Sequence, residues 1–189
     1  MVNPNYPVFD RLGNLYVSDS GTWKGDDGCV FRVQPNGTTD VWSMAVTNFP
    51  NGMALAPSED ALLIACSTPT PSVVRLPIAA DGSAGVAERV VELPQTVPDG
   101  LAFDAIGNLY IACYAPNRIY RLSPTNELAV LVEDWENTVI AGPANLAFCG
   151  ASLDMLVISS LSRWHLTRVD VGVPGLPLHY PRRDIHPLN

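Results

Sequence analysis

Short apolar segments separated by turns run along the whole chain. Segments such as LYVSD at 15–19, LLIAC at 62–66 and LYIAC at 109–113 have the length and composition of strands. No longer stretch carries apolar residues at a spacing of three or four, so helices are not predicted. Turns that read LGN or IGN supply glycine and asparagine, which accept the positive φ of tight hairpins. The pattern predicts an all-β protein of short antiparallel strands.

The strand pattern repeats four times along the chain. Each repeat starts with a short motif, PNY, PNG, PDG or PAN, and continues with four strand-like segments separated by turns. In the last repeat the fourth of these segments is LPLHY at 176–180, which contains His179. The Asn or Asp residues of successive motifs are 46, 48 and 46 residues apart. This period is that of a four-stranded β-propeller blade, and a β-sandwich, the alternative all-β fold, would not produce it. We therefore predict four four-stranded blades in residues 1–180 and a tail without strand pattern in residues 181–189.

Four blades are few for a propeller. No strand pattern precedes Asn5, and a ring that lacks blades leaves sheet faces uncovered at both ends. We therefore expect the chain to be the C-terminal part of a larger propeller. Its exposed blade faces would then allow self-association.

The polar residue at the start of each repeat is the main candidate for chemistry. In a propeller, the loop that enters the innermost strand of each blade faces the central channel, so these residues are expected to converge there. Carboxylate and amide oxygens are hard ligands suited to Ca²⁺, Mg²⁺ or Mn²⁺. The alternative is that Asn and Asp only make turn hydrogen bonds ahead of a strand. The four residues, called the polar ring below, are Asn5, Asn51, Asp99 and Asn145.

Composition and charge argue against several other functions. The net charge is −8, with 11 basic and 19 acidic residues, which disfavours nucleic acid as a partner because phosphate binding requires a positive surface. No apolar run is long enough for a transmembrane helix, so no membrane partner is expected. The 4 cysteines form no C-x-x-C pair, and the first residues do not resemble a secretory signal. We therefore expect buried free thiols and a cytoplasmic location.

A serine nucleophile and a histidine metal site have weaker support in the sequence. Ser20 lies in SDSG at 18–21, but no G-x-S-x-G nucleophile motif is present, which favours a strand-end turn. The 3 histidines, His165, His179 and His186, form no H-x-x-x-H pair. A histidine metal site is therefore not expected.

The motifs that begin the repeats resemble the SMP-30/gluconolactonase/LRE family, which includes regucalcin-like lactonases. The resemblance lies in PNYPVFDRLGNLYVSD, PNGMALAPSEDALLIA and, most specifically, PDGLAFDAIGNLYIACYAPNRIYRL, and it extends over residues 4–169. It implies a six-bladed propeller of which this chain contains the C-terminal four blades. It also implies one divalent cation in the channel, Ca²⁺, Mg²⁺, Mn²⁺ or Zn²⁺, and hydrolysis of sugar lactones such as gluconolactone.

The resemblance also implies a role for each residue of the polar ring. Asn51 and Asp99 match the family's metal ligands, and Asp99 also matches the aspartate that activates the water. Asn5 matches an asparagine that contacts substrate, and Asn145 lines the pocket or holds its loop. Two departures are visible: the family's glutamate ligand from the first blade has no counterpart, and Tyr6 stands where the family often has Asp or Gly. A site with two of three ligands is expected to bind metal weakly.

Three functions remain open from the sequence. The first is a metal-dependent lactonase whose substrate is a small-molecule lactone, with Asp99 as the general base. The second is a non-catalytic propeller that acts as an interaction scaffold. The third is a strictosidine-synthase-like or paraoxonase-like propeller, and the lack of a histidine near any channel loop argues against a paraoxonase-like histidine base.

Overall fold

The computed structural model describes residues 1–181, which form strands joined by turns and loops. Within this range no helix is long and apolar enough to span a membrane. The strands, in chain order, are β1 Pro4–Phe9, β2 Leu15–Asp19, β3 Cys29–Val33, β4 Thr39–Ser43, β5 Pro50–Leu55, β6 Ala61–Cys66, β7 Ser72–Pro77, β8 Glu88–Glu92, β9 Pro98–Phe103, β10 Leu109–Cys113, β11 Arg118–Leu122, β12 Leu128–Glu133, β13 Pro143–Cys149, β14 Met155–Ser160 and β15 Leu166–Val169.

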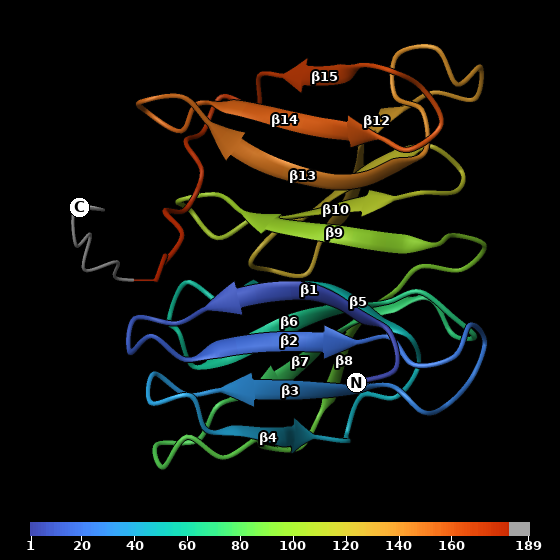
Figure 1. The fold of residues 1–189 in the computed structure, drawn as a ribbon. Helices are drawn as coiled ribbons and strands as arrows, with labels where there is room; N and C mark the ends of the chain where they lie inside the picture. The colour runs from blue at the N-terminus through green and yellow to red at the C-terminus, as the bar shows by residue number, and fades with distance from the viewer. Residues whose placement is uncertain (182–189) are drawn as a thin grey trace, which may run out of the picture.

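Each sequence repeat forms one sheet whose strands lie side by side in chain order. Blades 1, 2 and 3 are β1–β4, β5–β8 and β9–β12, and blade 4 is β13–β15. Neighbouring strands within a blade are antiparallel. Figure 1 shows the blades as stacked sheets whose first strands lie toward the middle of the molecule. The predicted all-β propeller with four blades is confirmed. The predicted tail begins at residue 181, and its remainder, 182–189, lies outside the described residues.

The last blade differs from the prediction in its outermost strand. The sequence pattern predicts a strand at 176–180, but among the described residues blade 4 ends with β15. The chain then crosses to blade 3, where the N–H of Leu176 donates to the carbonyl oxygen of Phe103 over 2.9 Å. Pro174 and Pro177 have no N–H to donate to a sheet ladder, which disfavours an additional strand here. The prediction for 176–180 is therefore wrong. This C-terminal segment lies near the tips of β9 and β13 in Figure 1.

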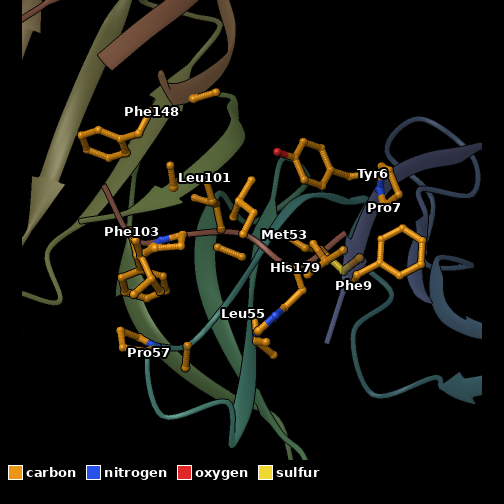
Figure 2. A pocket seen from close by; sticks show the side chains of 18 of the residues that line it. Tyr6, Pro7, Phe9, Met53, Leu55, Pro57, Leu101, Phe103, Phe148 and His179 are labelled. Atoms are coloured by element: carbon orange, nitrogen blue, oxygen red, sulfur yellow. The ribbon is translucent and has the colours of Figure 1, made fainter. Parts of the chain in front are cut away.

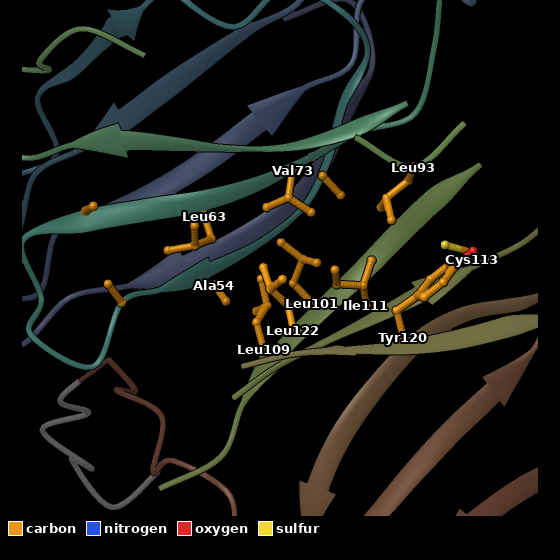
Figure 3. Close-up of a cluster of buried hydrophobic side chains, with 13 residues drawn as sticks. Ala54, Leu63, Val73, Leu93, Leu101, Leu109, Ile111, Cys113, Tyr120 and Leu122 are labelled. Carbon is orange, nitrogen blue, oxygen red and sulfur yellow. The ribbon is translucent and has the colours of Figure 1, made fainter. Parts of the chain in front are cut away.

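Apolar side chains fill the space between consecutive blades. Leu63 and Val73 of blade 2 pack with Leu101, Ile111 and Tyr120 of blade 3 in one buried cluster, shown in Figure 3. Two similar clusters join blade 1 to blade 2 and blade 3 to blade 4. The innermost strands pack in the same order, β1 against β5, β5 against β9, and β9 against β13. The blades are therefore held together in chain order, and burial of these apolar faces stabilises the arrangement.

The innermost hairpins of blades 1 and 3 contain the same polar turn. Oδ1 of Asp10 accepts hydrogen bonds from the N–H groups of Leu12 and Asn14, and the Asn14 side-chain amide donates to Oδ2 of Asp10. Asp104 and Asn108 repeat this arrangement in blade 3. The glycine before each asparagine has a positive φ, which explains why glycine occupies that position. These local bonds fix the hairpins that place the innermost strands.

Candidate functional site

All four residues of the polar ring lie near the start of an innermost strand, and therefore at the same end of the propeller. They are, in chain order, Asn5, Asn51, Asp99 and Asn145. The strands approach one another closely at this end. A Cβ atom on Gly52 would lie 2.2 Å from the backbone oxygen of Asp99, and a Cβ atom on Gly100 would lie 2.4 Å from Oδ1 of Asn145. The two glycines thus let β5, β9 and β13 bring their polar residues together.

The side chain of Asn51 is held so that its oxygen remains free. Its Nδ2 donates to Oγ of Ser67 over 3.1 Å, and this hydroxyl donates in turn to the carbonyl oxygen of Pro98 over 2.6 Å. Because a hydroxyl has a single proton, the Ser67 hydroxyl can only accept from Asn51, and this settles which end of the amide faces it. Oδ1 of Asn51 is buried and has no hydrogen-bond partner among the described residues. An unpartnered buried oxygen is costly unless a ligand satisfies it.

Asn5 repeats this arrangement in blade 1. Its Nδ2 donates to Oγ of Ser20 over 3.1 Å, and Ser20 donates to the carbonyl oxygen of Pro50 over 2.9 Å. Ser20 is buried, whereas Asn5 is exposed. Ser20 therefore orients Asn5 and joins blade 1 to blade 2, in agreement with the strand-end role expected for it.

Asp99 occupies the corresponding position in blade 3, where it is partly buried. Burial raises the pKa of its carboxyl group to about 7, because desolvation disfavours the charged form. No hydrogen bond to this carboxylate is present in residues 1–181. Among the described residues, Asp99 therefore has neither a hydrogen-bond donor nor a cationic side chain beside its carboxylate.

Tyr6 reaches from β1 toward the polar residues of the other blades. Its hydroxyl donates a long hydrogen bond, 3.5 Å, to Oδ1 of Asn145, which also accepts from the N–H of Leu146 over 2.8 Å. The pKa of Tyr6 is raised, chiefly by burial, and the nearby charge of Asp99 contributes to the rise. Figure 2 shows the Tyr6 ring pointing away from its strand toward the residues of β9 and β13. The Tyr6 hydroxyl of blade 1 is therefore in contact with the polar ring residue of blade 4, Asn145.

Burial of Asp99 predicts a pH effect on stability. Its pKa is about 7 in the folded protein against a usual 3.8, so between these pH values the folded state binds more protons than the unfolded state. Stability should therefore fall as pH rises through this interval. Asp99→Asn cannot titrate. In EDTA, the free energy of unfolding of the variant minus that of the wild type should therefore increase from about pH 5 to about pH 8. Urea denaturation at both pH values measures the difference, and an equal difference at both would show that the carboxyl group is well solvated.

The residues of the ring fit a hard divalent cation. The free Oδ1 of Asn51 and the carboxylate of Asp99 are both oxygen donors of the kind that Ca²⁺, Mg²⁺ and Mn²⁺ prefer. Residues 1–181 contain no cluster of three or more His, Cys, Asp or Glu that could hold a metal. A cation here would therefore depend on amide oxygens and on a single carboxylate.

Sequence reasoning missed the roles of Ser67 and Tyr6. Ser67 follows β6 at the position that Ser20 occupies after β2, so the repeat itself carried the signal. In the sequence Tyr6 is only a departure from the family motif, whereas in the structure its contact with Asn145 joins residues of blade 1 and blade 4. The sequence pattern places His179 in an outer strand, whereas in the structure the C-terminal segment brings its Nε2 to 2.8 Å from Oε1 of Glu59.

Comparison with known protein families gives a match over most of the chain. The sequence model described as the SMP-30/Gluconolactonase/LRE-like region matches residues 2–162. The chain belongs to this family. No curated protein matches the sequence significantly.

Solved structures with the same fold include three proteins of low sequence identity. A calcium-binding regucalcin from Agrobacterium tumefaciens is 16% identical, with a TM-score of 0.78 over 95% of this chain and 65% of that one. A luciferin-regenerating enzyme is 21% identical, with a TM-score of 0.75 over 91% and 62%. A gluconolactonase from Xanthomonas campestris is 18% identical, with a TM-score of 0.69 over 85% and 55%. The chain thus matches less than two thirds of the length of each of these proteins.

Proposed function

We propose that this protein is a divalent-metal-dependent hydrolase that opens a lactone ring. The observation that carries the proposal is the unpartnered Oδ1 of Asn51, next to the strand that carries Asp99. A non-catalytic scaffold has no need for a buried oxygen without a partner, whereas a ligand site does. Membership of the SMP-30/gluconolactonase/LRE-like family, and similarity to a gluconolactonase, support lactones as the substrate class.

Asn51 and Asp99 would hold the cation in this proposal. Once bound, the cation would polarise the carbonyl group of the lactone. Asn5 and Asn145 would position the substrate at the same end of the propeller. Ser20 would keep the side-chain amide of Asn5 oriented, and Ser67 would do the same for Asn51.

Asp99 would act as the general base. It would accept a proton from the attacking water while the water oxygen bonds to the carbonyl carbon. The bond from that carbon to the ring oxygen then breaks, and the proton held by Asp99 passes to the leaving alkoxide. The product is a hydroxy acid, so no oxidant or second substrate is required.

A metal-dependent assay tests the proposal. Hydrolysis of δ-gluconolactone, and of an unsubstituted δ-lactone, should be measured as acid release after treatment with EDTA and after addition of Ca²⁺, Mg²⁺, Mn²⁺ or Zn²⁺. At least one cation at millimolar concentration should restore hydrolysis, and the same cation should raise the melting temperature because it binds only the folded state. Lactone hydrolysis that is the same with and without EDTA, or absent with every cation, would contradict the proposal.

Self-association through exposed blade faces and a cytoplasmic location both stay predictions from the sequence.

A further inference from the structure

A largely apolar cavity lies between the four innermost strands. Its volume is about 410 Å³, which lies in the range of about 300–1,000 Å³ that is usual for small-molecule sites. Met53 and Leu55 of β5, Leu101 and Phe103 of β9, and Phe148 of β13 line it, as Figure 2 shows. The size and the enclosing strands therefore suit one small ligand.

The cavity begins where the polar ring ends. Tyr6 connects the two, because it lines the cavity and its hydroxyl donates to Oδ1 of Asn145. Met53 and Leu101 follow Asn51 and Asp99 by two residues on the same strands, and both line the cavity. A ligand with its polar group at the ring would therefore extend the rest of the molecule into the cavity.

The far end of the cavity is covered by the C-terminal segment. Leu176 and His179 line the cavity there, and Nε2 of His179 lies 2.8 Å from Oε1 of Glu59. Leu176 is held by its hydrogen bond to Phe103. The polar side chains of the lining thus lie at the two ends, and the wall between them is apolar. Sugar hydroxyl groups placed along this wall would lose their hydrogen bonds to water without replacement.

We propose that the cavity binds the alkyl chain of an alkyl-substituted lactone. The inference rests on the proposed function, because the lactone ring is placed at the polar ring and the chain in the cavity. The occupant is therefore a lactone with an apolar substituent on its ring, rather than a polyhydroxylated sugar lactone. Burial of each methylene group should tighten binding about fourfold, so four buried methylenes should give on the order of 10²-fold.

Binding of unreactive analogues tests the cavity independently of hydrolysis. Cyclohexanone and 3-heptylcyclohexanone carry the same ring carbonyl, cannot be hydrolysed, and differ only in the chain, which stands at the ring position that the heptyl group has in δ-dodecalactone. Calorimetric titration of the wild-type chain should give a dissociation constant at least 100-fold lower for the heptyl compound. Because this comparison uses the unmodified protein, it does not depend on the folding of any variant.

A cavity-filling variant tests where the chain lies. Ala147 lies on β13 and lines the cavity, so Ala147→Phe should weaken binding of the heptyl ketone at least tenfold. Ala129→Phe is the matched control, since Ala129 is exposed on the outermost strand of blade 3. The control should bind the heptyl ketone as the wild type does. Equal binding by the two variants would overturn the placement of the chain in this cavity.

The outcomes separate this inference from the proposed function. Equal affinity for the two ketones, together with metal-dependent hydrolysis of gluconolactone, would overturn the apolar substrate class and leave the hydrolase standing. Tight binding of the heptyl ketone, without hydrolysis of δ-dodecalactone or gluconolactone by any cation-loaded protein, would support the apolar ligand site and contradict the hydrolase. Chain-dependent binding with preferred hydrolysis of δ-dodecalactone would support both.

Discussion

Replacement of Asp99 by alanine is expected to abolish lactone hydrolysis. The variant loses the only carboxylate of the polar ring, and with it both a metal ligand and the proposed general base. Asp99→Asn keeps one neutral oxygen but cannot accept a proton from water. General-base catalysis typically contributes about 10²–10⁴-fold in rate, so Asp99→Asn should lose turnover by this factor even when metal is saturating. Initial rates across a metal titration measure both effects.

The control for these variants is Asp81→Asn, which makes the same chemical change in an exposed turn of blade 2. It should retain wild-type turnover and metal affinity. Near-full turnover by Asp99→Asn at saturating metal would show that Asp99 is not the base. Unchanged metal affinity in Asp99→Ala, measured by calorimetry, would show that the cation is held elsewhere.

Substitution of Gly52 by alanine is expected to destabilise the fold strongly. The new Cβ would lie 2.2 Å from the backbone oxygen of Asp99 and 2.7 Å from Cα of Gly100. Both are backbone atoms, so no side-chain rotation relieves the contact and β5 must move away from β9. Overpacking of this kind costs about 1–3 kcal/mol, and we expect the upper part of that range. The shift would also separate Asn51 from Asp99 and lower metal affinity.

Urea denaturation of Gly52→Ala and Gly37→Ala measures this effect. Gly37 has a φ of 86° and nothing within 4 Å of an added Cβ, so its variant reports backbone strain without a steric clash. A left-handed backbone costs a non-glycine residue about 1–2 kcal/mol. Stability and metal affinity equal to the wild type in Gly52→Ala would show that the innermost strands are not in close contact at the ring.

The local features of the fold were predictable because short-range chemistry sets them. The turn made by Asp10, Gly13 and Asn14 closes on itself through hydrogen bonds within five residues of the chain. Alternating or fully apolar segments of five or six residues can only be buried as strands when such turns interrupt them. The repeat then places the Asn or Asp of each motif near the start of the innermost strand in every blade. For this reason the polar ring could be named from the sequence.

The path of the C-terminal segment was not predictable in the same way. The segment at 176–180 has the apolar character of an outer strand, but its position depends on where Phe103 of blade 3 lies. That position is fixed by packing between blades, which no local pattern encodes. The same contact brings His179 to Glu59, 120 residues away in sequence.

By itself, the sequence determined the all-β class, the four repeats and the residues that begin them, since each follows from spacing, turn residues and the alternation of apolar positions. Only the tertiary structure decided how far those residues are solvated, which hydrogen bonds they make and how their pKa values shift. Asp99 acquires a raised pKa because surrounding blades remove water from it, and Asn51 keeps a free oxygen because Ser67 and Pro98 fix its amide. Tyr6 contacts the polar ring only because the fold brings its hydroxyl to 3.5 Å from Oδ1 of Asn145, 139 residues away in sequence. Solvation and hydrogen-bond partners depend on residues far apart in the chain, so they exist only once the blades have packed.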